Sequence, residues 1–365
     1  MKISYVIEDF SVCGGIERIV SRKASILAAR YGHDVTIISV YEDDRPIRYP
    51  LDGSIKTIRL HVPFTEKTTN HGLMALRRVK TLILAASRLN KALKTAEPDI
   101  VFFTTTLGAL LLPFCNIKSK KVFESHLARK FTPYNTFLSF TELKADAIVC
   151  LTSGDAKEYK TAKRIGVIPN FIDKPKACVK DYAVKRAVAV GRLEHQKSFD
   201  RLISCWKTAV ETHPGWHLDI YGEGPLRDEL QRQIDSFGLQ ETIKLRGTCA
   251  DMADKYAQYS LHLMTSRYEG QGIVLIEAQA AGLPSVVFNY EYGASDIVTD
   301  GVNGFLVPQN DTKTFTDRLA QMMDSEAMRA QFGTKAKETA KAFFTENIMW
   351  KWQKLIQETL NKHNR

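Results

Sequence analysis

Residues 267–278 read Arg-Tyr-Glu-Gly-Gln-Gly-Ile-Val-Leu-Ile-Glu-Ala, and this stretch decides the class of fold. The apolar run Leu261 to Met264 precedes it, and the apolar run Ile273 to Ala281 follows its two glycines. Such a pattern is typical of a buried strand, a tight turn and a helix. The turn exposes the free N–H groups of the helix's first turn, which can bind an anion such as a diphosphate. The stretch therefore predicts an α/β unit with an anion site at its turn.

Two carboxylates bracket this turn. Glu269 precedes the predicted helix and Glu277 lies about one turn inside it, so we expect them to flank the anion site without touching each other. This arrangement suits hydrogen bonds to hydroxyl groups at both ends of a sugar nucleotide, with Glu269 toward the sugar and Glu277 toward the ribose. A surface turn with a carboxylate favoured by the helix dipole explains the spacing equally well.

The alternation of short apolar runs with helical patterns extends outward in both directions. It predicts two consecutive α/β units with parallel sheets and right-handed crossovers, at residues 1–172 and 173–344, with a polar linker at 173–184. In the first unit the pattern predicts strands at Ile3–Ile7, Val35–Val40, Ile100–Thr104, Lys121–Glu124 and Ala147–Leu151, and helices at Ile16–Tyr31 and Leu73–Ala96. In the second unit it predicts strands at Ala187–Val190, His217–Tyr221, Ile243–Leu245, Leu261–Met264 and Ser285–Phe288, and helices at Phe199–Glu211 and Pro225–Ser236.

A second group of candidate ligands follows the first strand of the second unit. Gly191, Arg192 and Lys197 lie just beyond that strand, at the carboxyl edge where open α/β sheets bind ligands. The two cations can anchor a diphosphate and stabilise the charge that grows on it as it leaves.

Taken together, these motifs make the chain resemble the family 4 glycosyltransferases, which are retaining enzymes with two Rossmann-like domains facing across a cleft (the GT-B fold). The family's E-x7-E motif is present as Glu269 to Glu277. Further matches in the family's order are Gly191-Arg192-Leu193 with Lys197, Tyr221-Gly222-Glu223-Gly224-Pro225, Glu277 to Pro284 and Asp300-Gly301-Val302-Asn303-Gly304. The resemblance covers nearly all of the second half, and it implies that the C-terminal segment, residues 345–365, packs back on the first domain.

The first half resembles the family more loosely. Gly14-Gly15-Ile16-Glu17-Arg18 is similar to the glycine loop that approaches the donor phosphates and the acceptor, and Glu124-Ser125-His126 is similar to the segment with an active-site histidine. Two positions depart from the family pattern. Phe171 stands where glycine is usual, and Gln271 stands where phenylalanine is common.

The resemblance implies transfer of a hexosyl or N-acetylhexosaminyl group from a nucleotide sugar, expected to be UDP-linked, to a saccharide or lipid-linked acceptor in polysaccharide or glycolipid synthesis. It implies no metal and no other cofactor. The implied catalytic residues are His126, Arg192, Lys197 and Glu269, and the implied acceptor-binding residues are Gly14, Glu17, Arg18 and His126. The implied donor-binding residues are Gly15, Gly191, Arg192, Lys197, Glu269, Gly270, Gln271, Gly272, Ile273, Val274 and Glu277.

Charge is distributed unequally between the two halves. The chain carries a net +10, and residues 1–172 hold all of it, with 26 Lys+Arg against 16 Asp+Glu. Such asymmetry indicates an anionic partner for the first half, and a well-solvated face explains it equally well. The helix expected at residues 73–96 combines basic and apolar residues in a way suited to an anionic membrane surface. These residues are Arg77, Arg78, Lys80, Arg88, Lys91 and Lys94, set among Leu76, Val79, Leu82, Ile83, Leu84 and Leu93.

The composition narrows the remaining classes of protein. No apolar run is long enough to cross a bilayer and no secretory signal is visible, so we expect a cytoplasmic protein, peripheral on the membrane where the basic helix docks. The six cysteines are scattered without metal-ligand spacing. Neither half opens with the G-x-G-x-x-G of a dinucleotide oxidoreductase, and the basic half lacks the pattern of a common nucleic-acid-binding module. Another GT-B enzyme, such as a sugar-nucleotide epimerase, stays open as the alternative.

Overall fold

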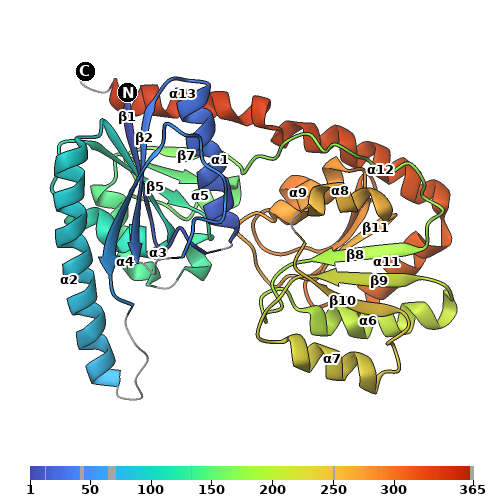
Figure 1. Cartoon of the computed structure of the whole chain (residues 1–365). Coiled ribbons are helices and arrows are strands. Elements are labelled where there is room, and N and C mark those ends of the chain that lie inside the picture. Colours follow the sequence, from blue (N-terminus) through green and yellow to red (C-terminus); the bar gives the residue numbers. More distant parts are fainter. Residues whose placement is uncertain (13, 42–44, 65–70, 133, 250, 362–365) are drawn as a thin grey trace. The chain divides into compact units, whose positions relative to one another are not determined.

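A computed structural model describes residues 1–12, 14–41, 45–64, 71–132, 134–249 and 251–361. The chain divides into two compact units, each a sheet with helices packed against it (Figure 1). The first unit comprises Met1–Pro169 and Met349–Arg365, and the second comprises Asn170–Ile348. The sequence pattern predicted that the first unit ends at residue 172. Phe171 and Ile172 instead belong to the second unit, where Ile172 forms a β-bridge with Phe344.

The first unit is built on one parallel sheet. In the described residues its strand order is β3-β2-β1-β4-β5-β6-β7. The central strands are buried on both faces, which explains why they read as continuous apolar runs. The strands are β1 (Lys2–Ile7), β2 (Asp34–Tyr41), β3 (Lys56–Val62), β4 (Ile100–Thr104), β5 (Lys120–Ser125), β6 (Ala147–Cys150) and β7 (Ile165–Val167).

The helices of the first unit pack on this sheet through apolar stripes. Ile19, Val20 and Leu27 of α1 are buried, as are Ala85 and Leu89 of α2. The helices are α1 (Gly15–Ala29), α2 (His71–Ala96), α3 (Thr105–Leu111), α4 (Asn135–Lys144), α5 (Ser153–Ala156) and α13 (Thr345–Leu360), with short 3-10 turns η1 (Leu112–Phe114) and η2 (Arg129–Phe131).

Most of α13 belongs to the first unit although it follows the second in sequence. Its residue Trp352 is buried and meets Phe102 of β4 edge to face, with ring centroids 6.0 Å apart. Leu355 lies against Gly166 of β7. The last helix is therefore part of the core of the first unit (Figure 1).

The second unit is also built on one sheet, which has its own strand order. In the described residues its strands are all parallel, in the order β10-β9-β8-β11-β12-β13. One core cluster packs Trp206 and Trp216 against aliphatic residues of one face of the sheet, among them Leu218, Ile220 and Leu263. The strands are β8 (Arg186–Val190), β9 (His217–Tyr221), β10 (Ile243–Gly247), β11 (Leu261–Met264), β12 (Ser285–Phe288) and β13 (Gly304–Val307).

Two helices of the second unit begin at a capping side chain. Asp311 accepts a hydrogen bond from the Thr314 amide before α11, and Ser325 accepts one from the Met328 amide before α12. The helices are α6 (Phe199–Thr212), α7 (Arg227–Ser236), α8 (Met252–Lys255), α9 (Ile273–Ala280), α10 (Ala294–Ile297), α11 (Thr312–Asp324) and α12 (Glu326–Ala340), with 3-10 turns η3 (Tyr256–Gln258) and η4 (Lys341–Phe343).

The α/β fold class expected from the sequence is confirmed. The strands at His217–Tyr221, Leu261–Met264 and Ser285–Phe288 have the predicted bounds. The segment 173–184, read from sequence as a linker, has no regular secondary structure but packs on the second unit. The amide of Val179 donates to Ala281 O at 2.8 Å, and the carbonyl of Tyr182 accepts from the guanidinium of Arg329.

Among the described helices, none has the length and apolar character needed to cross a membrane. The longest of them, α2, exposes basic residues together with Leu76, Val79 and Ile83, and its first turns extend beyond the strands of its own sheet (Figure 1).

A buried histidine links the stability of the second unit to pH. His262 on β11 is inaccessible to solvent, and its Nδ1 lies 3.2 Å from Ser285 Oγ. Burial, with a contribution from the Lys197 charge, lowers the pKa of His262 from 6.5 to about 3. Between these two pKa values His262 binds a proton in the unfolded chain but not in the folded one. Its contribution to the free energy of unfolding is therefore fully present above about pH 6.5 and is lost as the pH falls toward 3.

We predict that His262→Leu makes the protein less sensitive to acid. Between pH 7 and pH 5 the wild type should lose about 2 kcal/mol of unfolding free energy that the variant keeps, because only the wild type must exclude a proton from this position. Urea denaturation at both pH values measures the difference. Equal losses in the two proteins would contradict a neutral buried imidazole.

Candidate functional site

The carboxyl edge of the second sheet is shaped by glycines on two neighbouring loops. The amide of Gly191, after β8, donates to Tyr221 O at 2.9 Å, and the amide of Leu193 donates to Glu223 O at 3.0 Å. A Cβ at Gly222 would lie 1.8 Å from Gly191 O, and Gly222 has a φ of +144°. One at Gly224 would lie 2.5 Å from Leu193 O. The two loops therefore stack backbone on backbone, which fixes the position of the chain that carries Arg192.

An ion pair joins this edge to the next loop. Lys197 Nζ lies 2.6 Å from Glu269 Oε1, with side chains 14% and 10% exposed. Gln196 Nε2 donates to Glu269 Oε2 at 3.3 Å and to Tyr268 O at 2.9 Å. The sequence predicted Lys197 and Glu269 separately, as a phosphate ligand and a sugar ligand. The structure places them in direct contact, with both side chains partly open to solvent.

Helix α9 begins at the glycine turn between the two carboxylates. Gly272 caps it with φ +98°, and a Cβ there would lie 2.2 Å from the hydroxyl of Tyr290. That hydroxyl donates to Gln271 O at 2.7 Å. Because Ile273 and Val274 open the helix, their amides have no acceptor within it and are available to an anion.

Gln271, which stands where phenylalanine is common in the family, has a structural role within the second unit. The Gln271 side chain is buried, and its Oε1 accepts a hydrogen bond from the Asn170 amide at 2.8 Å. Phe171 is 1% exposed and thus a core residue. Gln271 therefore ties the start of the second unit to the turn that carries Gly270 and Gly272.

The remaining predicted donor ligands of the second unit differ in exposure. Glu277 is the fifth residue of α9 and is half-buried, so it lies one turn into the helix as expected. The side chain of Arg192 is 65% exposed and lies 3.1 Å from Glu194. Arg192 therefore contacts a neighbour in its own loop, while Lys197 contacts the loop that leads into α9.

A polar pocket of about 410 Å³ lies beside these loops. Three of its lining residues are basic, and two of those hold Asp219, which accepts from Arg186 at 2.7 Å and from Arg246 at 2.6 Å. These hydrogen bonds, with one from Tyr259, outweigh burial and lower the pKa of Asp219. No sequence motif marks the pocket, because its residues come from distant segments. It is lined by Arg186, Tyr221, Arg246, Thr248, Cys249, Lys255 and Gln258.

In the first unit, the glycine loop leads directly into α1. Gly14 is the residue before the helix and Gly15 its first residue. Glu17 is buried, and its carboxylate lies where a Cβ at Gly14 would be, at 2.2 Å. The backbone amide of Arg18 donates to Gly14 O at 3.2 Å. Of the predicted acceptor ligands in this loop, Glu17 is thus folded against the loop itself and Arg18 is half-buried.

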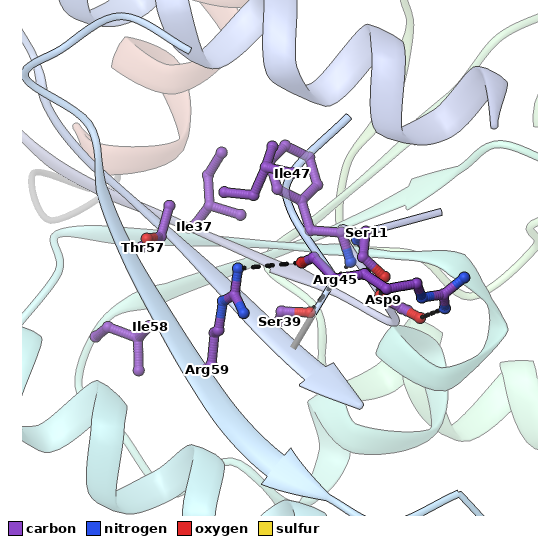
Figure 2. Close-up of a pocket in the computed structure, with 10 residues that line it drawn as sticks. Asp9, Ser11, Ile37, Ser39, Arg45, Ile47, Thr57, Ile58 and Arg59 are labelled. Atoms are coloured by element: carbon purple, nitrogen blue, oxygen red, sulfur yellow. Dashed lines mark hydrogen bonds and ion pairs between the residues drawn. The ribbon is translucent and has the colours of Figure 1, made fainter. Parts of the chain in front are cut away.

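A small cavity of about 20 Å³ lies between the segment that follows β1 and residues within β2 and β3 (Figure 2). Arg45 Nη2 lies 3.3 Å from Asp9 Oδ2, and Arg59 donates to Arg45 O at 3.4 Å. Ser39 comes from β2 and faces the same space. The first unit therefore also presents guanidinium groups beside this cavity.

His126 follows β5 and is held by a buried charge network. His126 Nε2 lies 3.0 Å from Glu124 Oε2, and Lys23 Nζ contacts both carboxylate oxygens of Glu124 at 2.6 and 2.5 Å. Burial opposes ionisation of Glu124, but the charge of Lys23 and the hydrogen bond from His126 lower its pKa overall. The sequence identified His126 and missed Lys23, which lies 101 residues from Glu124.

Two Rossmann-like units with glycine loops at the carboxyl edges of their sheets define a class of proteins that bind ligands at those edges. Comparison with known proteins identifies the family. The Glycosyltransferase Family 4 model matches residues 13–175, and the Glycosyl transferases group 1 model matches residues 174–339. The chain belongs to the family 4 glycosyltransferases and has the GT-B fold. The resemblance inferred from the sequence is confirmed.

Similarity to several known proteins extends over nearly the whole chain. The amylovoran biosynthesis glycosyltransferase AmsD of Erwinia amylovora is 28% identical over 381 residues, which cover 97% of this chain and 99% of AmsD. The exopolysaccharide phosphotransferase SCO2592 of Streptomyces coelicolor is 28% identical over 397 residues, but this chain spans only 41% of its length. Among solved structures, a mutant of S. aureus TarM in complex with Fondaparinux, alpha-GlcNAc-glycerol and UDP has a TM-score of 0.82 and 16% identity, over 97% of this chain and 99% of that one. This likeness to TarM is one of fold.

We predict that Gly222→Ala destabilises the second unit by about 3 kcal/mol. A Cβ would strain a left-handed backbone and also strike Gly191 O. Gly238→Ala is the matched control, because Gly238 also has positive φ but no atom lies within 4 Å of the added carbon. Its expected loss is about 1 kcal/mol. Chemical denaturation measures both, and equal losses would show that the two loops do not pack as tightly as described.

Proposed function

We propose that this glycosyltransferase moves a hexosyl or N-acetylhexosaminyl group, with retention of configuration, from a UDP-linked sugar to a saccharide or lipid-linked acceptor in bacterial cell-surface polysaccharide synthesis. The observation that carries the proposal is the Lys197–Glu269 ion pair beside the amino end of α9, which places a cation, an acceptor of hydroxyl hydrogen bonds and free helix amides together. The similarity to AmsD, a glycosyltransferase of amylovoran biosynthesis, and to TarM, which was solved with UDP, supports this proposal.

The donor is proposed to bind to the second unit through its charged end. Its diphosphate interacts with the amides of Ile273 and Val274, with Lys197 and with Arg192, while Glu269 accepts hydrogen bonds from the sugar hydroxyls and Glu277 from the ribose. The Lys197–Glu269 pair holds both side chains in place before the donor arrives, so little ordering is needed on binding.

Transfer then needs a leaving group and a nucleophile on one face of the sugar. The bond between the anomeric carbon and the phosphate oxygen breaks, the acceptor oxygen forms the new bond, and the acceptor proton passes to the departing phosphate. The cations stabilise the charge that develops there, so we propose that the reaction uses no metal and no other cofactor. His126 orients the acceptor in the first unit.

The acceptor is proposed to be anionic, because the first half of the chain carries the whole net charge of +10. Arg45 and Arg59 present guanidinium groups beside a small cavity that β2 and β3 line (Figure 2). Such groups suit phosphate or carboxylate groups of a polysaccharide precursor.

We predict that Glu277→Ala weakens binding of UDP by about tenfold or more, because the ribose loses a charge-assisted hydrogen bond. Isothermal titration calorimetry measures the affinity, after a panel of sugar nucleotides has been screened for thermal stabilisation. Glu338→Ala, an exposed glutamate on α12 paired with Lys335, is the control and should bind UDP normally. Unchanged affinity in Glu277→Ala would remove this residue from the donor site.

Two further measurements test the reaction itself. Turnover of the wild type with its donor and acceptor should survive EDTA. Consumption of the donor in the absence of an acceptor, with formation of an epimeric sugar nucleotide, would indicate an epimerase instead.

A second proposal concerns where the enzyme works. Helix α2 has a buried apolar stripe in its second half and an exposed apolar stripe, which faces another direction, in its first half. Ala85, Leu89 and Leu93 are buried in the first unit, whereas Leu76, Val79 and Ile83 are 53%, 54% and 64% exposed. The exposed basic residues of the helix are Arg77, Arg78, Lys80, Arg88, Lys91 and Lys94. We propose that this side rests on the anionic inner face of the cytoplasmic membrane, where the lipid-linked acceptor is located.

We predict that the wild type sediments with vesicles rich in anionic lipid at low salt and dissociates as the salt concentration rises. The double variant Leu76→Asp with Ile83→Asp should lose most of this binding. Trp350→Asp is the control, because Trp350 of α13 is an equally exposed apolar residue on the same unit, at 53%. Equal sedimentation of all three proteins would refute docking through α2.

A further inference from the structure

A lysine lies in the core of the first unit. Lys23 of α1 is 0% exposed, and its Nζ lies 3.6 Å from the centre of the Trp352 ring and 5.1 Å from that of Tyr5. Phe102 lies slightly farther away, at 5.7 Å. Full burial of a lysine is rare and requires compensation of its charge. Aromatic faces supply part of that compensation, and a carboxylate supplies the rest.

That carboxylate is Glu124 at the end of β5, which is 2% exposed and contacts Lys23 through both oxygens. Burial lowers the pKa of Lys23, and the charge of Glu124 opposes this effect. A buried ion pair of this kind is a poor means of stabilising a fold, since apolar residues of similar shape usually serve as well. The pair therefore needs a reason beyond stability.

The reason lies in the third member of the network. Glu124 Oε2, which contacts Lys23 at 2.5 Å, is also 3.0 Å from His126 Nε2. Two apolar side chains could replace the ion pair in the core, but they could not hold an imidazole. The ionised carboxylate accepts a hydrogen bond from Nε2–H and so selects one tautomer of the neutral ring, with Nδ1 as the remaining acceptor.

The backbone around His126 is fixed separately. Ser125 Oγ donates to Asp155 Oδ2 at 2.9 Å, and the amide of Arg129 donates to Asp155 Oδ1 at 2.7 Å. Asp155 belongs to the short helix α5 and is itself buried. The main chain is therefore held by Asp155 on both sides of His126, while the ring is held by Glu124. Two independent constraints on one side chain are what a preorganised site requires.

We propose that Lys23 and Glu124 are positioning residues for His126: Lys23 keeps Glu124 ionised, and Glu124 fixes the imidazole as the Nε2–H tautomer, so that Nδ1 is the atom that accepts a hydrogen bond from the acceptor hydroxyl. Trp352 of α13 closes the network from the other side. This inference rests on the proposed function only for the role of His126; the ring's tautomer and orientation are properties of the first unit alone.

The first test uses the unmodified protein. Long-range proton–nitrogen NMR spectra of protein labelled with ¹⁵N-histidine distinguish the two tautomers, and the spectrum of His126→Gln identifies the His126 signals. At a pH where the ring is neutral we expect a protonated Nε2 and an unprotonated Nδ1. A protonated Nδ1 overturns the proposal, whether or not the protein shows transferase activity.

The second test removes the charges without leaving one partner alone. In Lys23→Met with Glu124→Leu, both partners become apolar, so the core keeps its volume and no charge is stranded. We expect normal affinity for UDP, a near-normal unfolding midpoint, loss of the fixed Nε2–H signature and a turnover number about 10- to 100-fold lower. Arg164→Met with Glu358→Leu is the control, because it removes a different ion pair of the first unit, one that joins Arg164 to α13. Turnover of the control should be unchanged.

A double-mutant cycle separates positioning from general damage. In the His126→Gln background, the Lys23→Met and Glu124→Leu changes should lower turnover no further, because the residue they act on is already absent. Losses that multiply would show that the pair acts independently of His126 and would overturn the proposal. A wild-type protein that transfers no sugar would refute the proposed function, and the NMR result would still decide the positioning role.

Discussion

Parallel pairing of the strands is the constraint on which both units depend. Every described strand in the two sheets runs parallel to its neighbours, so the carboxyl ends of the strands in each sheet meet at one edge. Each connection must return across the sheet, and each return places a loop at that edge. Residues far apart in sequence thereby become neighbours. Lys197 and Glu269 meet at 2.6 Å across 72 residues because the loops after β8 and β11 begin at adjacent strands.

This constraint also explains what the sequence could and could not predict. Strands buried on both faces, such as β11 and β12, are short apolar runs between polar loops, and their predicted bounds match the structure. Edge strands lack that signal. β3 alternates between exposed and buried residues, and β7 is three residues long, so neither produces a continuous run. Helices α11 and α12 were missed, although each begins at a capping residue, Asp311 and Ser325, that the sequence shows.

At the candidate sites, motifs located the loops but not the contacts between them. Glycines could be assigned to turns from sequence, because a tight turn favours them. That Gly222 must be glycine because Gly191 O occupies the space of its Cβ depends on the register of β8 against β9, which no local pattern encodes. In the same way, His126 stands out in sequence as a histidine after a strand. Lys23 reads as one more polar residue of a helix, and only the packing of α1 against β5 reveals its partner.

Each unit contains a lysine–glutamate ion pair, and the two pairs differ in their exposure to solvent. Lys197 and Glu269 keep some exposure to solvent, so in the proposed donor site their pair can exchange partners when an anion and sugar hydroxyls arrive. Lys23 and Glu124 have almost none, and aromatic rings cover the lysine, so their charges are fixed. An ion pair that must respond to a ligand has to stay near water, whereas one that orients a side chain gains from being sealed. The exposure of the two pairs, more than their distances, therefore separates a ligand-binding role from a positioning role.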